Sequence, residues 1–187
     1  MYAAGSAALK VFSFDGDNIV TLSSSQQNIG IRSINAHPEK YYFAIGRAAN
    51  AARDQLQIYD LNAATDTIST VTQDTLGTYV NAVRWNRSGD HIAIATAESE
   101  LLVYSFDNGT ISRSGEISFD GSAENNGLDW NSDGDRIVVN ADNGVLSIFS
   151  FDGTSLTVST SIYINGAPSI LGVSWKPNSS LIAVAIN

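Results

Sequence analysis

The sequence predicts an all-β protein built from repeated four-stranded antiparallel sheets, and three observations support this prediction. First, the three tryptophans lie 45 residues apart, at Trp85, Trp130 and Trp175. Second, a separate phrase with a central aromatic residue recurs in phase with them. Third, each period holds four short apolar runs that are separated by turn residues. Repeats of this length are typical of modular folds, in which each unit packs against its neighbours.

The first repeated phrase ends in a tryptophan and occupies residues 80–85, 125–130 and 170–175. Each copy is followed by a polar turn and then by a short apolar run, at 92–94, 137–139 and 182–184. A degenerate early copy occupies 31–36, where Ala36 stands at the position of the tryptophan. We therefore expect the first two strands of each unit to be joined by a tight polar turn.

The second repeated phrase carries the aromatic residues Phe12, Tyr59, Tyr104 and Phe149, which are spaced by 47, 45 and 45 residues. Because these aromatics recur once in every unit, we expect them and the tryptophans to pack between neighbouring units rather than to form a binding site. Two phrases that recur four times in phase are not a chance pattern.

The third copy shows the complete unit, with apolar runs at 80–85, 91–95, 101–106 and 111–117. Gly-Asp and Asp-Asn-Gly sequences separate the runs, and these residues tolerate the positive φ of hairpin turns. Four antiparallel strands in about 45 residues make one blade of a β-propeller. The polar fourth run is expected at the exposed outer edge. Residues 1–187 are therefore predicted to form a single β-propeller of about four blades.

The pattern Trp-x-x-x-Gly-Asp-x-Ile-Ala-Ile-Ala at 85–95, followed by Leu-x-Val-Tyr-Ser-Phe at 101–106, resembles the WD-repeat and WD-like propeller superfamily. The resemblance covers essentially the whole chain, and it implies the propeller fold. The Trp-Asp dipeptide of that family is represented once, by Tyr59-Asp60, and no Gly-His dipeptide precedes a first strand. Residues 101–111 are also similar to lactonase-type propellers.

Both ends of the chain are predicted to fall in the second strand of a blade, at residues 2–4 and 181–187. Three arrangements follow from this phase. The chain is a segment of a longer propeller, or two chains form a homodimer that completes an eight-bladed ring, or the chain closes on itself as four blades. Open blade faces would be large apolar patches that need a covering partner.

The composition excludes several functional classes. The chain carries 19 acidic against 10 basic residues, a net charge of −9, so we expect neither nucleic acid nor an anionic membrane as a partner. It has no cysteine, which removes disulfides, thiolate metal sites and thiol nucleophiles. No apolar run approaches the roughly 20 residues of a membrane span, and no signal peptide is recognisable, so a soluble protein is expected.

Few residues point to catalysis or metal binding. His37 and His91 are both expected to be structural residues of a turn or of the rim. Residues 131–135 place oxygen atoms as a calcium loop does, but Arg136 and Asp142 stand where that loop needs glycine and glutamate. We therefore expect no catalytic residue, no metal and no cofactor, and we predict that the chain is not an enzyme.

Recognition of a partner is expected where loops break the repeat. The loop after the second strand is longest in the early copy, at residues 46–55. It and its counterparts are expected to share one face with the segments that lead into the first strands. The candidate protein-binding residues on this face are Arg47, Arg53, Tyr79, Glu98, Glu100, Asp142 and Asn143.

The leading functional hypothesis is a non-enzymatic propeller that serves as a scaffold for protein–protein interaction or assembly. One alternative is that the chain is part of a lactonase-like or other hydrolytic propeller, with the channel-lining residues Arg32, Asn81, Arg84 and Asp129. Another alternative is a propeller fragment that self-associates and has no function of its own.

Overall fold

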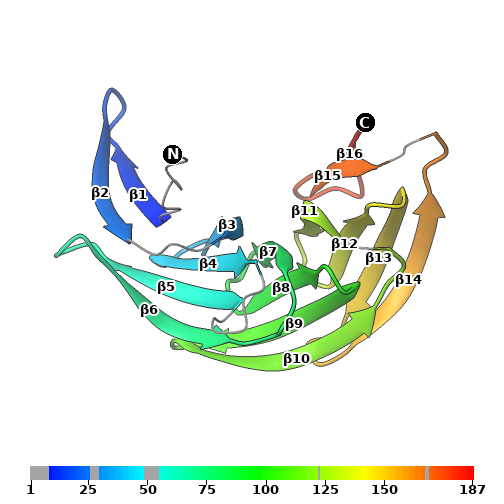
Figure 1. Ribbon diagram of the computed structural model, residues 1–187, viewed down its shortest axis with the longest axis horizontal. Coiled ribbons are helices and arrows are strands. Elements are labelled where there is room, and N and C mark those ends of the chain that lie inside the picture. Colours follow the sequence, from blue (N-terminus) through cyan, green and yellow to red (C-terminus); the bar gives the residue numbers. More distant parts are fainter. Residues whose placement is uncertain (1–8, 26–29, 49–54, 122, 167–168) are drawn as a thin grey trace, which may run out of the picture.

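The computed structural model describes residues 9–25, 30–48, 55–121, 123–166 and 169–187. Within these ranges the elements are all β-strands, arranged in antiparallel sheets in sequence order. Figure 1 shows the sheets side by side in an arc, with the first strand of each sheet on the inside. The prediction of an all-β propeller with four-stranded antiparallel blades is confirmed.

Three blades are complete. Blade I consists of β3 (Ile31–Ala36), β4 (Tyr42–Arg47), β5 (Leu56–Asn62) and β6 (Thr67–Asp74). Blade II consists of β7 (Val80–Trp85), β8 (His91–Thr96), β9 (Glu100–Asp107) and β10 (Thr110–Ser118). Blade III consists of β11 (Ala123–Trp130), β12 (Arg136–Ala141), β13 (Val145–Phe151) and β14 (Leu156–Tyr163).

Two half-blades flank the complete ones. The N-terminal half-blade pairs β1 (Leu9–Phe14) with β2 (Ile19–Ser25), and the C-terminal half-blade pairs β15 (Ile170–Trp175) with β16 (Ile182–Ile186). The second-strand position predicted for the C-terminal end is thus occupied by β16. Residues 2–4, for which the same position is predicted, lie outside the described residues.

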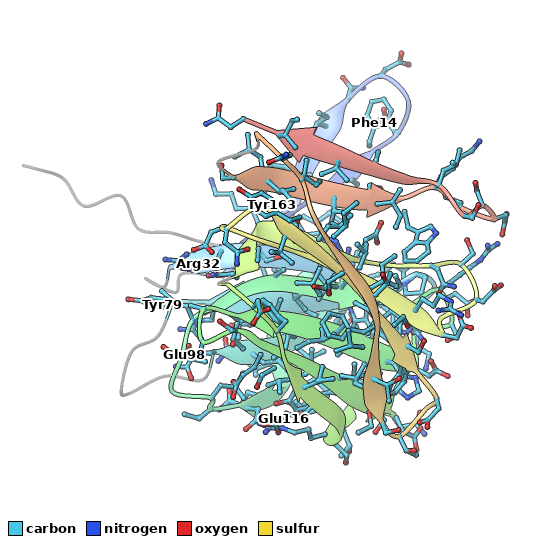
Figure 2. All side chains as sticks on the ribbon, turned by 90° about the vertical axis from the view of Figure 1, so that its right-hand side faces the viewer. Phe14, Arg32, Tyr79, Glu98, Glu116 and Tyr163 are labelled. Carbon is cyan, nitrogen blue, oxygen red and sulfur yellow. The ribbon has the colours of Figure 1, made fainter. Side chains whose placement is uncertain are left out.

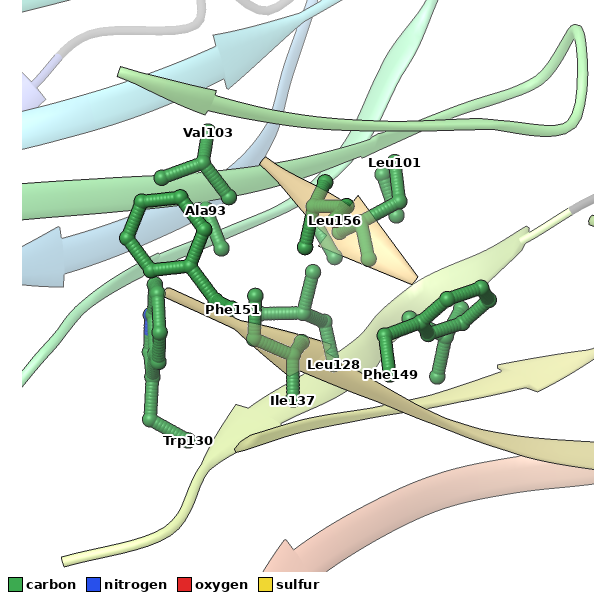
Figure 3. Packing of buried hydrophobic residues seen from close by; sticks show 12 residues of the cluster. Ala93, Leu101, Val103, Leu128, Trp130, Ile137, Phe149, Phe151 and Leu156 are labelled. Atoms are coloured by element: carbon green, nitrogen blue, oxygen red, sulfur yellow. The ribbon is translucent and has the colours of Figure 1, made fainter. Parts of the chain in front are cut away.

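The core lies between blades rather than inside one sheet. Ala93, Leu101 and Val103 of blade II pack against Leu128, Trp130, Ile137, Phe149, Phe151 and Leu156 of blade III (Figure 3). A second cluster joins blades I and II through side chains such as Ile58, Trp85, Tyr104 and Phe106. Each blade can bury its faces only against a neighbour, as the recurring aromatic residues predict.

His37 contributes an aromatic ring to this packing in blade I, where Ala36 stands at the position of the tryptophan. Its ring is buried and lies 4.8 Å from the ring of Trp85 in the next blade. Gly89, in the β7–β8 turn, lies directly beneath it: a Cβ there would come within 2.4 Å of the imidazole, and its φ of 75° favours glycine as well. His37 is thus a structural residue of a turn, as expected, and its ring is enclosed between two blades.

We expect His37 to make the protein sensitive to mild acid. Its Nδ1 accepts hydrogen bonds from the amides of Glu39 and Lys40, both at 3.0 Å, so protonation of Nδ1 would break both bonds. Burial lowers the pKa of His37 below its usual 6.5, although a hydrogen bond with the Gly89 backbone opposes the shift. Because the unfolded chain then binds the proton more readily, the free energy of unfolding should fall as the pH drops below about 6.5.

Urea denaturation at about pH 7.5 and about pH 5 measures this effect. His37→Asn keeps a turn-capping acceptor, as Asn86 provides in the next blade, and it should flatten the pH dependence, whatever its effect on the absolute stability. His91→Asn, which removes the other histidine, is measured in parallel so that the two slopes can be compared. Equal slopes in the wild type and in His37→Asn would contradict the assignment.

Candidate functional site

The loops after second strands and the segments that lead into first strands meet on one face of the arc. In blade II the amide of Ala97 donates to the carbonyl of Tyr79 at 3.0 Å, and in blade I the amide of Ala48 donates to Gly30 at 2.8 Å. We call this side the loop face, and it includes residues 75–79, 97–99, 119–121 and 142–144. The turns at the other ends of the strands form the opposite face.

Tyr79 is an exposed aromatic residue of the loop face. It directly precedes β7, and its side chain is exposed, with 41% of the residue's surface accessible. The Cζ atom of Arg32, from β3, lies 4.6 Å from the centre of the Tyr79 ring. A cation–π contact of this kind contributes about 0.5–1 kcal/mol at an exposed site. The contact therefore links blade I to blade II and restricts the orientation of the tyrosine.

The guanidinium of Arg32 is itself held in place by blade II. Its Nη1 donates to the Oδ1 of Asn81 at 3.0 Å, and Asn81 is a buried residue of β7. Tyr79 and Asn81 are two residues apart on the same segment, so one arginine contacts both. From the sequence, Arg32 and Asn81 are predicted only as channel residues of a hydrolytic propeller. Arg32 is not among the residues predicted to bind a partner on the loop face.

Acidic side chains are also exposed on the loop face. Glu98 is exposed in the turn after β8 and follows Ala97, whose amide binds the Tyr79 carbonyl. Figure 2 shows Arg32, Tyr79 and Glu98 on the same side of the arc. Asp120 and Asp142 are exposed in the corresponding turns after β10 and β12. The described part of this face thus combines one arginine-backed tyrosine with several carboxylates.

The remaining predicted binding residues differ in their placement. Asn143 is exposed in the turn beside Asp142, and its amide packs where Gly121 lacks a side chain. Glu100 is the first residue of β9 and is half-buried. Arg47 is the last residue of β4 rather than a loop residue, and only 2% of it is exposed. Arg53 lies outside the described residues.

The residues predicted to line a channel take part in contacts between the blades. The carboxylate of Asp129, on β11, accepts hydrogen bonds from the amide of Trp175 at 2.7 Å and from the hydroxyl of Ser174 at 3.3 Å. It also accepts from the amide of Trp130 at 3.0 Å. At the corresponding position of β3, the Oδ1 of Asn35 accepts from the amide of Trp85 at 2.8 Å. A side chain of one first strand thus binds the backbone of the next.

Arg84 completes this row on β7. Its Nη1 donates to the carbonyl of Val83 at 2.8 Å, and burial lowers its pKa, an effect that the charge of Asp129 opposes. A hollow of about 470 Å³ lies at this end of the strands, and its lining includes Asp129, Trp130 and Trp175. The carboxylate that faces the hollow is already an acceptor for two backbone amides, which is a structural use.

The part of the chain that the structure describes contains no group of three histidine, aspartate or glutamate side chains that could hold a metal ion. The calcium-like segment forms a hairpin turn, in which Asn131 Oδ1 accepts hydrogen bonds from the amides of Asp135 and Arg136 at 3.2 and 3.0 Å. Across the described ranges, no helix has the length and apolar character needed to cross a bilayer.

Comparison with known proteins supports the fold. No protein-family model matches the chain, and no curated protein sequence matches it. Crystal structures of Chaetomium thermophilum Sqt1 match it with TM-scores of 0.76, for Sqt1 bound to the N-terminus of ribosomal protein L10, and 0.74, for Sqt1 alone. Each covers 96% of this chain at 17% identity.

Saccharomyces cerevisiae Sqt1 matches over 73% of this chain, with a TM-score of 0.61 and 13% identity. The chain spans about half of the length of the Chaetomium thermophilum Sqt1 chains, 51% and 48%, and 36% of the yeast chain. These identities establish the fold and nothing finer. The chain has a β-propeller fold, which is the fold that the resemblance of its sequence implies.

Proposed function

We propose that the chain is a non-enzymatic propeller module that binds a segment of another protein on its loop face. The observation that carries the proposal is the Tyr79–Arg32 pair, an exposed aromatic ring in contact with a guanidinium that is itself held by Asn81. Exposed tyrosines of this kind are common anchors in protein interfaces, since a large ring is buried at a low cost in conformational entropy. The arginine contact reduces that cost further.

We infer the chemistry of the partner from the charges on the loop face. Glu98, Asp120 and Asp142 are exposed on the same face, and the chain as a whole carries a net charge of −9. An extended segment with Lys or Arg side chains beside an apolar residue would match both the carboxylates and the tyrosine. Charge complementarity of this kind accelerates association and makes it sensitive to salt.

A structural neighbour supports binding of a protein segment by a propeller with this architecture. Chaetomium thermophilum Sqt1 has been solved bound to the N-terminus of ribosomal protein L10, and it matches 96% of this chain. The low identity of 17% transfers only the fold, so the identity of the partner is not carried over.

The contacts of Asp129 favour a binding module over the hydrolytic alternative. The carboxylate accepts hydrogen bonds from the amides of Trp130 and Trp175. Its neighbour Arg84 donates to the carbonyl of Val83. Both side chains are thus bound to backbone groups of the first strands, which is a structural role rather than a catalytic one.

Selection from a displayed library of random linear peptides, followed by fluorescence anisotropy on the selected sequences, tests the proposal. We expect the peptides to be rich in Lys and Arg. Tyr79→Ala should weaken their binding by about 30-fold, the effect of losing roughly 2 kcal/mol at an interface anchor. Tyr41→Ala is the matched control, because Tyr41 is also exposed but lies in the β3–β4 turn on the opposite face.

Tyr41→Ala should bind within about twofold of the wild type, since surface changes outside the interface have small effects. Glu98→Gln should weaken binding most at low salt and little at high salt, because screening already reduces its contribution. If Tyr79→Ala bound the peptides as tightly as the wild type, the loop face would not be the binding site.

A further inference from the structure

A hollow of about 320 Å³ lies between blades II and III, where β10 ends at the loop face. Ser118, Phe119 and Asp120 line it from blade II, and side chains of β13 and β14 line it from blade III. Both of these blades are complete four-stranded sheets. The hollow is therefore bounded by strands that have all of their partners within the sheet.

Polar side chains bridge the corresponding place between blades I and II. The hydroxyl of Tyr104, in β9, donates to the Oδ2 of Asp74 at 2.7 Å, at the end of blade I. Arg113 lies opposite Tyr104 in β10 and donates to its hydroxyl at 3.3 Å. The same guanidinium donates to the Oε2 of Glu116 at 2.9 Å. A phenol, a guanidinium and two carboxylates thus occupy this position in the repeat.

Smaller side chains stand at the same positions in blade III. Phe149 holds the position of Tyr104 but has no hydroxyl to reach the preceding blade. Val158 lies opposite Phe149 as Arg113 lies opposite Tyr104, and its side chain is several atoms shorter. The polar bridge cannot form with these residues, so the space that it would occupy is left as the hollow.

Part of the lining is apolar. The rings of Phe119 and Phe149 meet edge to face with centroids 6.4 Å apart, and Phe149 is fully buried. Figure 3 shows Phe149 at one end of the cluster between the blades, away from Trp130 and Phe151. Val158 is 56% exposed, although its side of β14 faces blade II. An apolar group that entered the hollow would therefore cover Val158.

The polar groups of the lining are suited to accept hydrogen bonds. The Oγ atoms of Ser147 and Ser161 lie 2.9 Å apart in a hydrogen bond, and each hydroxyl oxygen has two lone pairs, so the pair keeps acceptor capacity. Asp120 is exposed, and its carboxylate forms no hydrogen bond or ion pair in the described part of the chain. Among the described residues that line the hollow there is no lysine, arginine or histidine. A cationic donor matches this set of groups.

We propose that the hollow holds the side chain of a lysine from the protein segment that binds the loop face. The alkyl stem would lie along Val158 and Phe119, as long basic side chains commonly cover apolar surface. The ammonium group has three donors and no acceptor, so it can bind Asp120 and a serine hydroxyl together. An arginine matches less well, because its planar fork pairs best with both oxygens of one carboxylate. This inference rests on the proposed function, since the partner supplies the lysine.

An NMR titration of the full chain, labelled with ¹⁵N, tests the hollow without a peptide. The probe is Nα-acetyl-lysine N-methylamide, which presents one lysine side chain. We expect saturable shifts of the amides of Phe119, Asp120 and Ser147, with a dissociation constant on the order of millimolar for a ligand of this size. The capped norleucine and capped arginine probes should bind about fivefold more weakly, the effect of losing one ion pair at a partly exposed site.

Asp120→Asn should weaken binding of the capped lysine by about fivefold. Glu98→Gln is the matched control, because it removes the same charge from the same face at a residue that does not line the hollow. This control should bind within about twofold of the wild type. Equal weakening by the two variants would assign the effect to the general charge of the face and would overturn the proposal.

Val158→Arg gives the hollow the residue that blade II has at this position. The guanidinium would occupy the hollow and repel the ammonium group, so the shifts caused by the capped lysine should disappear. Because Val158 is more than half exposed, the variant should keep the fold, and unchanged amide signals in blade I would confirm this. Binding of the capped lysine to Val158→Arg with wild-type affinity would contradict the assignment of the hollow.

Tyr79→Ala separates this proposal from the proposed function, because it should bind the capped lysine as the wild type does. No saturable shift up to about 50 mM capped lysine, with selected peptides that still depend on Tyr79, would overturn the lysine site and leave the loop-face function in place. Shifts at the hollow, with peptides that do not depend on Tyr79, would support the lysine site and overturn the role of Tyr79 as the anchor.

Discussion

Replacing Trp130 with alanine should lower the free energy of unfolding by about 3–5 kcal/mol, the usual cost of removing a large buried aromatic side chain. Trp130 is 6% exposed and lies in the cluster between blades II and III (Figure 3). Its ring contacts that of Phe151 edge to face, with centroids 5.8 Å apart. Its Nε1 donates to the carbonyl of Arg84 at 3.1 Å, which adds a polar link to the preceding blade.

Urea denaturation followed by circular dichroism measures this loss. Trp130→Phe keeps an aromatic ring but removes the hydrogen bond and part of the volume, so it should cost about 1–2 kcal/mol. Tyr41→Ala is the surface control and should change the stability by less than about 0.5 kcal/mol. If Trp130→Ala were no more destabilising than Tyr41→Ala, the core between blades II and III would not be as described.

Replacing Asp129 with alanine should release the C-terminal half-blade from blade III and cost about 2–3 kcal/mol, as expected for the loss of hydrogen bonds to a charged acceptor. The carboxylate accepts from the amide of Trp175 at 2.7 Å and from the hydroxyl of Ser174 at 3.3 Å, both in β15. Without it, the Trp175 amide has to find water or remain unbonded within the packed inner strands. Unsatisfied amides of this kind favour local opening.

Hydrogen exchange of the amides in β15 and β16 measures this opening. In Asp129→Ala these amides should exchange faster, whereas those of β7 and β8 should keep the wild-type rate. Asp129→Asn retains a carbonyl oxygen as an acceptor, so it should lose only about half as much stability. Uniform acceleration in every blade would indicate global destabilisation instead of the release of one half-blade.

The strands themselves follow from local sequence. The runs at 80–85 and 111–117 predict β7 and β10 to within one residue at either end, because alternating apolar residues and Gly–Asp turns encode a hairpin locally. These hairpin signals lie close in the sequence to the strands that they specify. The recurrence of the tryptophans, by contrast, predicts the blade from a spacing of 45 residues.

The candidate site was harder to predict from the sequence. Tyr79 and Glu98 lie in the predicted loops, but Arg47 is buried at the end of β4. Arg32 contacts Tyr79 across a separation of 47 residues. Neither result has a local signal, because each depends on which strands of neighbouring blades are adjacent. A comparison of equivalent positions, Arg32 in β3 and Asn81 in β7, could have indicated that the two side chains meet.

The sequence by itself determined that this protein is made of four-stranded blades, and it located their turns and their repeated aromatic positions. Only the tertiary structure decided which of those positions are buried. Phe12 and Phe149 occupy the same place in the repeat, yet one is 52% exposed and the other is fully buried. The physical reason is that burial in a propeller is a property of the interface between blades, so the same residue is core or surface according to the neighbour it has.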